Sequence, residues 1–183
     1  MKVEALSIPD VLLLTPVVHA DARGAFLESW NAREFAMLGL AGPFVQDNES
    51  HSVRCVLRGL HCQVQHTQGK LIRAVLGEVF DVAVDLRSSS PTFGTWCAAR
   101  LTGEGHAMMW IPPGFAHGYY TLTARATVLY KVTDYYSPSD EKCVKWNDPA
   151  IGIAWPVAEA GEPILSERDQ DGVLLAEAKG WFE

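Results

Sequence analysis

The chain contains 183 residues, which suits one domain with a core large enough to fold without disulfides or metal. Fifteen lysines and arginines against 22 aspartates and glutamates give a net charge of −7, and nucleic-acid binding requires a basic face instead. No apolar stretch is long enough for a membrane-spanning helix, and the first residues lack the pattern of a signal peptide. We therefore expect one cytoplasmic domain over residues 1–183, with no nucleic-acid partner and no membrane association.

In chain order, the first regular element expected is a short helix over residues 32–38, which Asn31 and Glu34 can cap and Gly39 can close. From about residue 11 to residue 133, short apolar runs alternate with Gly, Pro, Asn and Ser, which is typical of an antiparallel sandwich or barrel. The predicted strands include residues 44–48, 70–76, 79–86, 95–101, 107–111 and 127–133.

The strand over residues 79–86 has the clearest alternation, which predicts one core face and one more polar face. Gly77 precedes it and favours a hairpin with residues 70–76. Residues 134–149 read as a long aromatic loop that can close over a ligand. Ser166 with Asp169 can cap a C-terminal helix reaching Lys179. No repeat or linker indicates a second domain.

The four cysteines show no Cys-x-x-Cys pair and no zinc-type spacing, so we expect reduced thiols. They are Cys55, Cys62, Cys97 and Cys143. An acidic chain can still bind a small anion through a local basic cluster. The candidates for such a cluster are Arg23, Arg58, Lys70 and Arg73.

The segment 58–63, followed by Lys70, Gly77 and the segment 112–117, resembles a cupin metal site with replaced ligands. A metal-binding cupin has His-x-His, then Glu, then a third His. Here Gln63 and Lys70 stand at the second His and at the Glu, and an ammonium group cannot ligate a cation. We therefore expect no metal. A His beside a buried Lys favours proton removal with stabilisation of the negative charge that results.

Each candidate residue also has a structural interpretation when it is taken alone. His61 can be a core histidine, His117 a turn histidine at the barrel mouth, Tyr130 a packing tyrosine, and Asp169 a helix cap. Cys62 points to the opposite strand face from His61 and is excluded as a nucleophile of the same site.

Several polar residues are nevertheless expected together on strands around the barrel interior. Arg58, His61, Gln63 and Lys70 form this group, and unpaired charge there is costly unless a ligand meets it. A functional role for the cluster is therefore favoured.

Taken together, the ordered motifs resemble the dTDP-4-dehydrorhamnose 3,5-epimerase family over residues 21–169. The motifs lie at residues 21–28, 44–48, 57–61, 68–71, 81–87, 90–94, 111–118 and 146–149. The resemblance implies a mainly β fold, a cupin-type jelly-roll β-barrel with a few short helices and a short C-terminal helical segment. It also implies no cofactor, and a homodimer that exchanges N-terminal strands.

The family's reaction inverts C3 and C5 of dTDP-4-dehydro-6-deoxy-D-glucose to give dTDP-4-dehydro-L-rhamnose. By resemblance, His61 is the general base and Asp169 the carboxylate that orients it. Lys70 stabilises the enolate oxygen at C4, and Tyr130 returns a proton from the opposite face.

Further positions match residues that the family uses around the nucleotide, diphosphate and sugar. They are Arg23, Phe26, Glu28, Gln46, Asn48, Arg58 and His117, with Tyr136 as the aromatic residue that stacks on the base. Strand exchange implies that some of them serve the pocket of the neighbouring subunit.

The chain departs from the family at Cys62, Pro113 and residues 124–126, and residues 64–67 beside the pocket wall are unusual. The sugar specificity therefore stays open between a 3,5-epimerase, a C3-only epimerase and an epimerase of another 4-keto nucleotide sugar. A noncatalytic nucleotide-sugar-binding cupin is a further alternative. A metal-dependent cupin oxygenase is disfavoured by Gln63 and Lys70.

Overall fold

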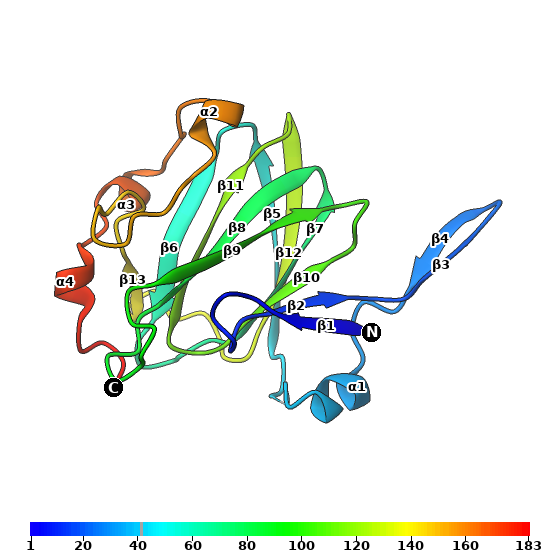
Figure 1. Cartoon of the computed structure of the whole chain (residues 1–183), viewed down its shortest axis with the longest axis horizontal. Helices are drawn as coiled ribbons and strands as arrows, with labels where there is room; N and C mark the ends of the chain where they lie inside the picture. Colours follow the sequence, from blue (N-terminus) through cyan, green and yellow to red (C-terminus); the bar gives the residue numbers. More distant parts are fainter. Residues whose placement is uncertain (41) are drawn as a thin grey trace.

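Two antiparallel sheets, one of six strands and one of five, form the body of the chain (Figure 1). The computed structural model describes residues 1–40 and 42–183. The larger sheet has the order β1-β2-β10-β7-β12-β5. Its strands are β1 (Lys2–Ala5), β2 (Leu12–Thr15), β5 (Gln46–Val53), β7 (Lys70–Leu76), β10 (Met108–Ile111) and β12 (Arg125–Val132).

The smaller sheet has the order β13-β6-β11-β8-β9, and β3 and β4 form a separate two-stranded hairpin. The strands of these two sheets are β3 (Val18–Asp21), β4 (Gly24–Leu27), β6 (Leu57–Gln63), β8 (Glu78–Asp85), β9 (Trp96–Thr102), β11 (Phe115–Thr121) and β13 (Glu141–Cys143). The short helices are α1 (Ala32–Met37), α2 (Val157–Ala160), α3 (Glu167–Gln170) and α4 (Leu175–Ala178). The prediction of a mainly β jelly-roll fold is confirmed.

Gly77 makes the tight turn between β7 and β8, but the predicted hairpin is wrong, because β7 pairs within the larger sheet and β8 within the smaller one. The Gly77 φ of +70° lies in the left-handed region, and a Cβ there would collide with the carbonyl oxygen of Arg125. The predicted strands agree with β7, β8, β9, β10 and β12 to within about two residues, the usual uncertainty of strand ends. Strand β5 begins later than predicted and continues to Val53, and no strand was predicted for β11.

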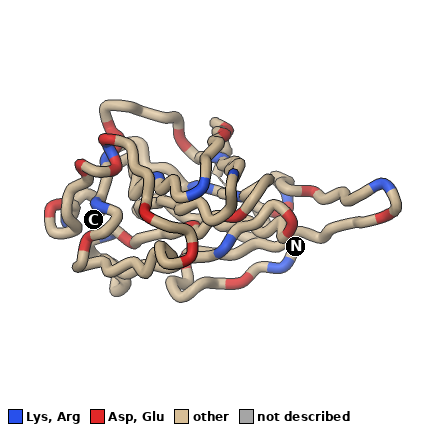
Figure 2. Tube along the Cα trace, turned by 90° about the horizontal axis from the view of Figure 1, so that it is seen from above, with Lys and Arg blue, Asp and Glu red and all other residues tan. Residues whose placement is uncertain are grey.

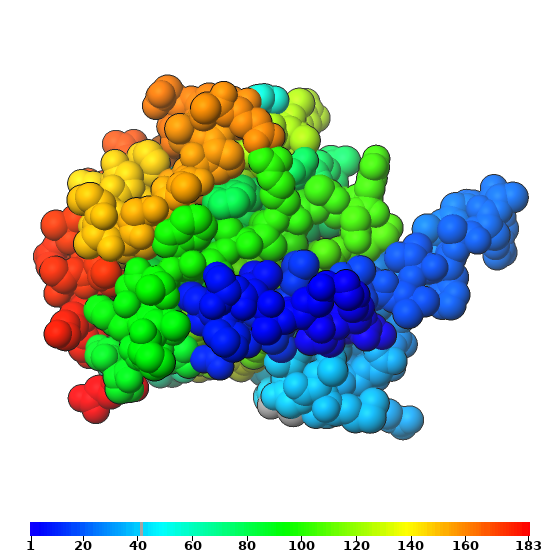
Figure 3. All heavy atoms as spheres, in the orientation of Figure 1, coloured from blue at the N-terminus to red at the C-terminus, as the bar shows by residue number. Residues whose placement is uncertain are grey.

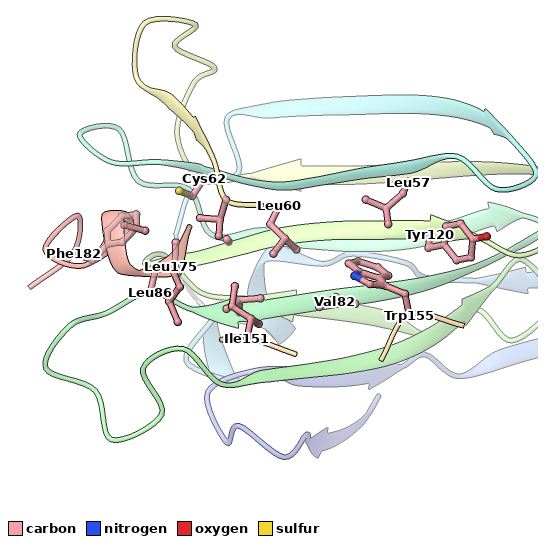
Figure 4. Close-up of a cluster of buried hydrophobic side chains, with 14 of the residues drawn as sticks. Leu57, Leu60, Cys62, Val82, Leu86, Tyr120, Ile151, Trp155, Leu175 and Phe182 are labelled. Carbon is pink, nitrogen blue, oxygen red and sulfur yellow. The ribbon is translucent and has the colours of Figure 1, made fainter. Parts of the chain in front are cut away.

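Both faces of β8 are largely buried, and the face predicted to be more polar carries the buried carboxylates of Asp81 and Asp85. Val82 belongs to a hydrophobic cluster that includes Trp155 and Leu175 from the C-terminal segment (Figure 4). Val79, on the other face, packs in a second cluster between the sheets. The C-terminal segment therefore covers a face of the smaller sheet that would otherwise be exposed to solvent. Full burial of one such aliphatic side chain is worth roughly 1.5–3 kcal/mol.

The N-terminal helix forms as predicted, since the Asn31 side chain accepts hydrogen bonds from the backbone nitrogens of Arg33 and Glu34. The prediction of a single C-terminal helix that reaches Lys179 is wrong. Two short helices, α3 and α4, form instead, because Val173 between them pairs with Val144 in a parallel bridge. The predicted loop over residues 134–149 likewise contains β13, which pairs with β6.

The β3–β4 hairpin projects away from the body of the molecule (Figures 1 and 3). Acidic and basic positions are scattered over the tube in Figure 2, and both kinds occur near the hairpin tip. There Arg23 forms an exposed ion pair with Asp21 at 2.6 Å. Within the described part of the chain, no helix has the length and apolar character needed to cross a membrane.

Candidate active site

A pocket with a volume of about 340 Å³ opens between the two sheets, and side chains from both sheets line it. It brings together most of the predicted site residues, although these are distant in the sequence. The lining residues are Gln46, Asn48, Ser50, Arg58, His61, Cys62, Gln63, Gln68, Lys70, His117, Tyr119, Tyr130, Tyr136 and Glu141. Polar and aromatic side chains thus converge in one concave site, which is typical of a small-molecule pocket.

His61, on β6, is paired with Asp169 from α3. The distance from His61 Nε2 to Asp169 Oδ1 is 2.7 Å, although the angle departs from that of a well-formed hydrogen bond. The His61 side chain keeps 26% of its surface exposed, whereas that of Asp169 keeps 5%. A buried carboxylate therefore holds one ring nitrogen, and Nδ1 is the nitrogen left for a ligand.

Asp169 bonds to Ser166, the N-cap residue of α3, and is at the same time the partner of His61. Ser166 Oγ donates to Asp169 Oδ2 at 2.6 Å, and the backbone nitrogen of Gly59 donates to Oδ1 at 3.1 Å. Burial raises the pKa of Asp169, but the donors from His61, Ser166 and Gly59 outweigh it and lower the pKa to about 2. The carboxylate is therefore charged at neutral pH.

Gly59 lets β6 and β11 approach closely at this point. A Cβ on Gly59 would lie 2.6 Å from the Gly118 Cα, and its φ of +120° is unfavourable for other residues. The register between β6 and β11 shifts beside it. Arg58 and His61, three positions apart, consequently both line the pocket.

Lys70 begins β7 on the opposite sheet and is buried, with 8% of its surface exposed. Its Nζ donates to the backbone oxygen of His61 at 3.5 Å, a long contact. Burial lowers the pKa of Lys70, against the opposing effects of Cys62, Glu141 and Asp81. An anionic group in the pocket would favour the charged form of this amine.

Tyr130, on β12, lines the pocket from the larger sheet, whereas His61 lines it from the smaller sheet. Burial raises the pKa of Tyr130, which keeps its phenol protonated at neutral pH. Neighbouring Tyr119 has its hydroxyl occupied by Ser50 at 2.8 Å and Ser52 at 3.1 Å. Two opposed walls thus present two groups that can exchange protons.

The interpretation of His117 as a turn residue is wrong, because it lies within the buried strand β11, directly opposite His61 on β6. Its Nε2 lies 3.0 Å from each carboxylate oxygen of Asp81, which is fully buried. Asp81 was assigned only to the polar side of a strand. No sequence signal indicated that it would meet His117 across β8 and β11.

Gln63, at the replaced cupin position, binds the segment between β12 and β13. Its Nε2 donates to the backbone oxygens of His66 and Tyr135 at 2.7 and 3.1 Å. Its Oε1 accepts from the backbone nitrogen of Ser137 at 2.9 Å. Both ends of the amide are used, so Gln63 holds this segment beside the pocket.

The nucleotide-binding candidates form a second connected group at the pocket. Gln46 donates from Nε2 to Asn48 Oδ1 at 2.8 Å, and its Oε1 accepts from the Tyr136 backbone nitrogen at 3.0 Å. The Tyr136 hydroxyl donates to Glu141 Oε2 at 2.7 Å, and Arg168 donates to the same oxygen. Glu141 was missed because β13 was read as a loop. Ser50, Gln68 and Tyr119 were missed as well, although each lies two residues from a predicted site residue, namely Asn48, Lys70 and His117, and strand alternation could have indicated them.

Arg23, Phe26 and Glu28 lie outside this pocket, on or beside the projecting hairpin. Phe26 is 71% exposed. Arg73, a candidate for anion binding, lines a different surface depression on the larger sheet. The structure of one chain therefore assembles the predicted catalytic set and only part of the predicted binding set.

All four cysteines are free, as expected. Cys62 belongs to the hydrophobic cluster between β6 and the C-terminal segment (Figure 4), and burial raises its pKa to about 12. Its thiol is therefore protonated at neutral pH, which disfavours it as a nucleophile, although Cys62 also lines the pocket near Lys70.

Comparison with known proteins indicates the same family along nearly the whole chain. The model of the dTDP-4-dehydrorhamnose 3,5-epimerase family matches residues 5–177. The dTDP-4-dehydrorhamnose 3,5-epimerase of Pseudomonas aeruginosa is 54% identical over 179 residues, which cover 97% of this chain and 98% of that protein. The enzyme of the same name from Salmonella typhimurium is 52% identical over 180 residues, covering 97% of each.

A solved structure gives the corresponding result for the fold. It is the dTDP-6-deoxy-D-glucose-3,5-epimerase of Legionella pneumophila in complex with dTDP-4-keto-L-rhamnose, with a TM-score of 0.92 and 45% identity. The alignment covers 97% of this chain and 96% of that chain. Jelly-roll fold, pocket and relatives together define an isomerase. The chain belongs to the dTDP-4-dehydrorhamnose 3,5-epimerase family.

Proposed function

We propose that the chain epimerises C3 and C5 of dTDP-4-dehydro-6-deoxy-D-glucose to form dTDP-4-dehydro-L-rhamnose. The observation that carries this proposal is the His61–Asp169 pair, at 2.7 Å, in one pocket with Lys70 and Tyr130. Both carbons are adjacent to the C4 ketone, so their protons can be removed to give an enolate. The pocket supplies a base, a cation and an acid for this chemistry.

His61 acts as the base that removes the proton at C3 and then at C5. Asp169, charged and nearly fully buried, orients the ring and stabilises the imidazolium that forms. Lys70 faces the developing negative charge on the C4 oxygen. Its buried position supports this role, because an ammonium group is worth more to an enolate in a site with little water.

Tyr130 returns the proton on the face opposite His61. Inversion requires a donor on the other side of the sugar ring, and Tyr130 comes from the other sheet. Its raised pKa keeps a proton available at neutral pH. No metal or cofactor is assigned to this chemistry, because the amide of Gln63 and the ammonium of Lys70 occupy two of the cupin ligand positions.

The nucleotide is bound by the group around Gln46, Asn48 and Tyr136, with Tyr136 stacking on the base. Arg58 at the pocket mouth suits the diphosphate, since a guanidinium can donate two parallel hydrogen bonds to phosphate oxygens. His117, held by Asp81, contacts the sugar side of the pocket. This set fits an anionic nucleotide sugar even though the whole chain is acidic.

The working form is a homodimer in which the β3–β4 hairpin enters the neighbouring subunit's pocket. The hairpin projects from the body with Phe26 exposed, and Arg23, Phe26 and Glu28 lie outside the pocket of their own chain (Figure 1). Exchange of the hairpin would bring these three residues to the ligand of the neighbouring subunit and cover the apolar ring of Phe26. A cytoplasmic location stays a prediction alongside this assembly.

One experiment tests the proposed reaction. The protein is incubated with dTDP-4-dehydro-6-deoxy-D-glucose in heavy water, and deuterium at C3 and C5 is followed by NMR. Incorporation at both carbons with formation of the L-rhamnose configuration is expected. Deuterium at C3 alone would replace the proposal with a C3-only epimerase, and binding without exchange would indicate a noncatalytic protein or another sugar.

A further inference from the structure

A thiol lies against the His61–Asp169 pair, at the edge of the pocket. Cys143, on β13, is directly opposite His61 in the β6–β13 register, so the two side chains extend from the same face. Metal-ligand atoms of His61, Cys143 and Asp169 all lie within 4.8 Å of one another. An imidazole, a thiol and a carboxylate thus meet from β6, β13 and α3.

This combination of donors suits a borderline-soft divalent ion. Zinc binds imidazole nitrogen, thiolate sulfur and carboxylate oxygen, and three protein ligands plus one water complete a tetrahedral open site. Ligand atoms of such a site lie roughly 3–4 Å apart, so small side-chain movements suffice here. His61 lines the pocket with 26% of its side chain exposed, which gives an ion access and leaves room for a water.

The local charges favour a cation as well. Asp169 supplies one carboxylate, and Glu141 is a second carboxylate near the Cys143 thiol. The thiol carries a proton when no ion is bound. The ion would therefore displace the thiol proton to solvent as the sulfur–metal bond forms, with no change of oxidation state.

We propose that His61, Cys143 and Asp169 form an inhibitory binding site for Zn²⁺. The ligand set differs from the replaced cupin positions, because neither Gln63 nor Lys70 belongs to it. A bound ion would occupy the side chains of both the base and its orienting carboxylate, and proton abstraction would stop. The inhibitory effect rests on the proposed function, whereas metal binding itself does not.

Metal binding is tested first, with protein that has been treated with EDTA and dialysed. Titration calorimetry with ZnCl₂ should show one ion per chain, and Co²⁺ should produce a thiolate-to-cobalt absorption band in the near ultraviolet. Cys143→Ala should remove the band and weaken Zn²⁺ binding at least about tenfold. Loss of a residue that merely supports a metal ligand already weakens binding by about that factor. Cys55→Ala, at another half-buried free cysteine, should leave both signals unchanged.

Epimerase assays supply the second readout. Zn²⁺ should inhibit the unaltered protein, EDTA should restore activity, and Cys143→Ala should keep its basal activity while resisting the ion at least about tenfold better. Binding or inhibition that is unchanged in Cys143→Ala would overturn the site. Cys143-dependent binding in a protein without epimerase activity would leave the site standing and refute the proposed function instead.

Discussion

The side-chain oxygen of Gln63 accepts a hydrogen bond from the backbone nitrogen of Ser137 at 2.9 Å. Because the Gln63 nitrogen also donates to the oxygens of His66 and Tyr135, one buried amide holds the backbone on both sides of Tyr136. This contact gives a role to the residue that replaces a histidine in the cupin pattern. Gln63 positions the segment that carries the proposed stacking aromatic.

Replacing Gln63 with Leu should therefore weaken nucleotide binding more than it slows the chemical step. Loss of the three hydrogen bonds frees this segment from β6, at a cost of about 0.5–1.5 kcal/mol for each bond. We expect a raised KM for the dTDP sugar and a raised Kd for dTDP, with a smaller change in kcat. Gln65→Ala, an exposed glutamine two residues away, is the matched control. A loss of kcat at unchanged KM would contradict the positioning role.

Tyr130→Phe should impair net inversion more than proton removal. The phenol is the proposed donor on the face opposite His61, and removal of such an acid typically costs about 10²–10⁴-fold in rate. Product formation and loss of the substrate C3 proton are measured in the same heavy-water reaction. Tyr119→Phe serves as the control, since its hydroxyl is already bonded to Ser50 and Ser52. Equal losses of exchange and inversion in Tyr130→Phe would argue against its role as the acid.

Lys70→Met should abolish epimerisation and at the same time stabilise the fold. Burial lowers the Lys70 pKa from 10.5, so the folded state disfavours its charge. The cost is greatest at low pH and disappears as the pH rises past 10.5, where the unfolded chain is also neutral. Near neutral pH we expect a gain in unfolding free energy of about 1–4 kcal/mol, as for other buried charges replaced by apolar groups.

Thermal denaturation at several pH values measures this gain, which should shrink toward alkaline pH. Lys142→Met, at an exposed lysine on β13, is the control and should change stability little. A destabilised but active Lys70→Met protein would contradict both the electrostatic cost and the enolate role.

Subunits with different lesions should restore one another's activity if the hairpin is exchanged. Arg23→Ala damages the pocket of the neighbour, whereas His61→Ala damages the pocket of its own chain. A mixed dimer then contains one pocket without either change, and coexpressed chains should be more active than either variant alone. His61→Ala coexpressed with Lys70→Met is the control, because both lesions lie in their own chain's pocket. Equal recovery in both mixtures, or in neither, would contradict hairpin exchange.

The catalytic candidates could be found in the sequence because they stand in short ordered motifs. His61 and Lys70 keep cupin positions on two strands, and the turn at Gly77 was visible from its residue type, although the strands on its two sides pair in different sheets. Asp81 and Glu141 could not be found in this way. Asp81 meets His117 across the pairing of β8 with β11, and Glu141 stands in β13, whose pairing with β6 no local pattern specifies.

The C-terminal segment shows the same limit for the fold. Its capping pair at Ser166 and Asp169 predicted one helix, whereas tertiary pairing of Val173 with Val144 divides the segment into α3 and α4. Asp169, in α3, lies beside the middle of β6, where it contacts Gly59 and His61. The capping pair was visible in the local sequence. The pairing of Asp169 with His61 depends on the assembled sheet and was not.

The most direct test of the account is proton exchange by the His61→Ala variant. The variant and the unaltered protein are incubated with dTDP-4-dehydro-6-deoxy-D-glucose in heavy water, and dTDP binding is measured on both by calorimetry. If His61 is the base, the variant binds dTDP with little change in Kd and incorporates no deuterium at C3 or C5 above the uncatalysed rate. Exchange that persists at the rate of the unaltered protein, with dTDP binding intact, would contradict the assignment.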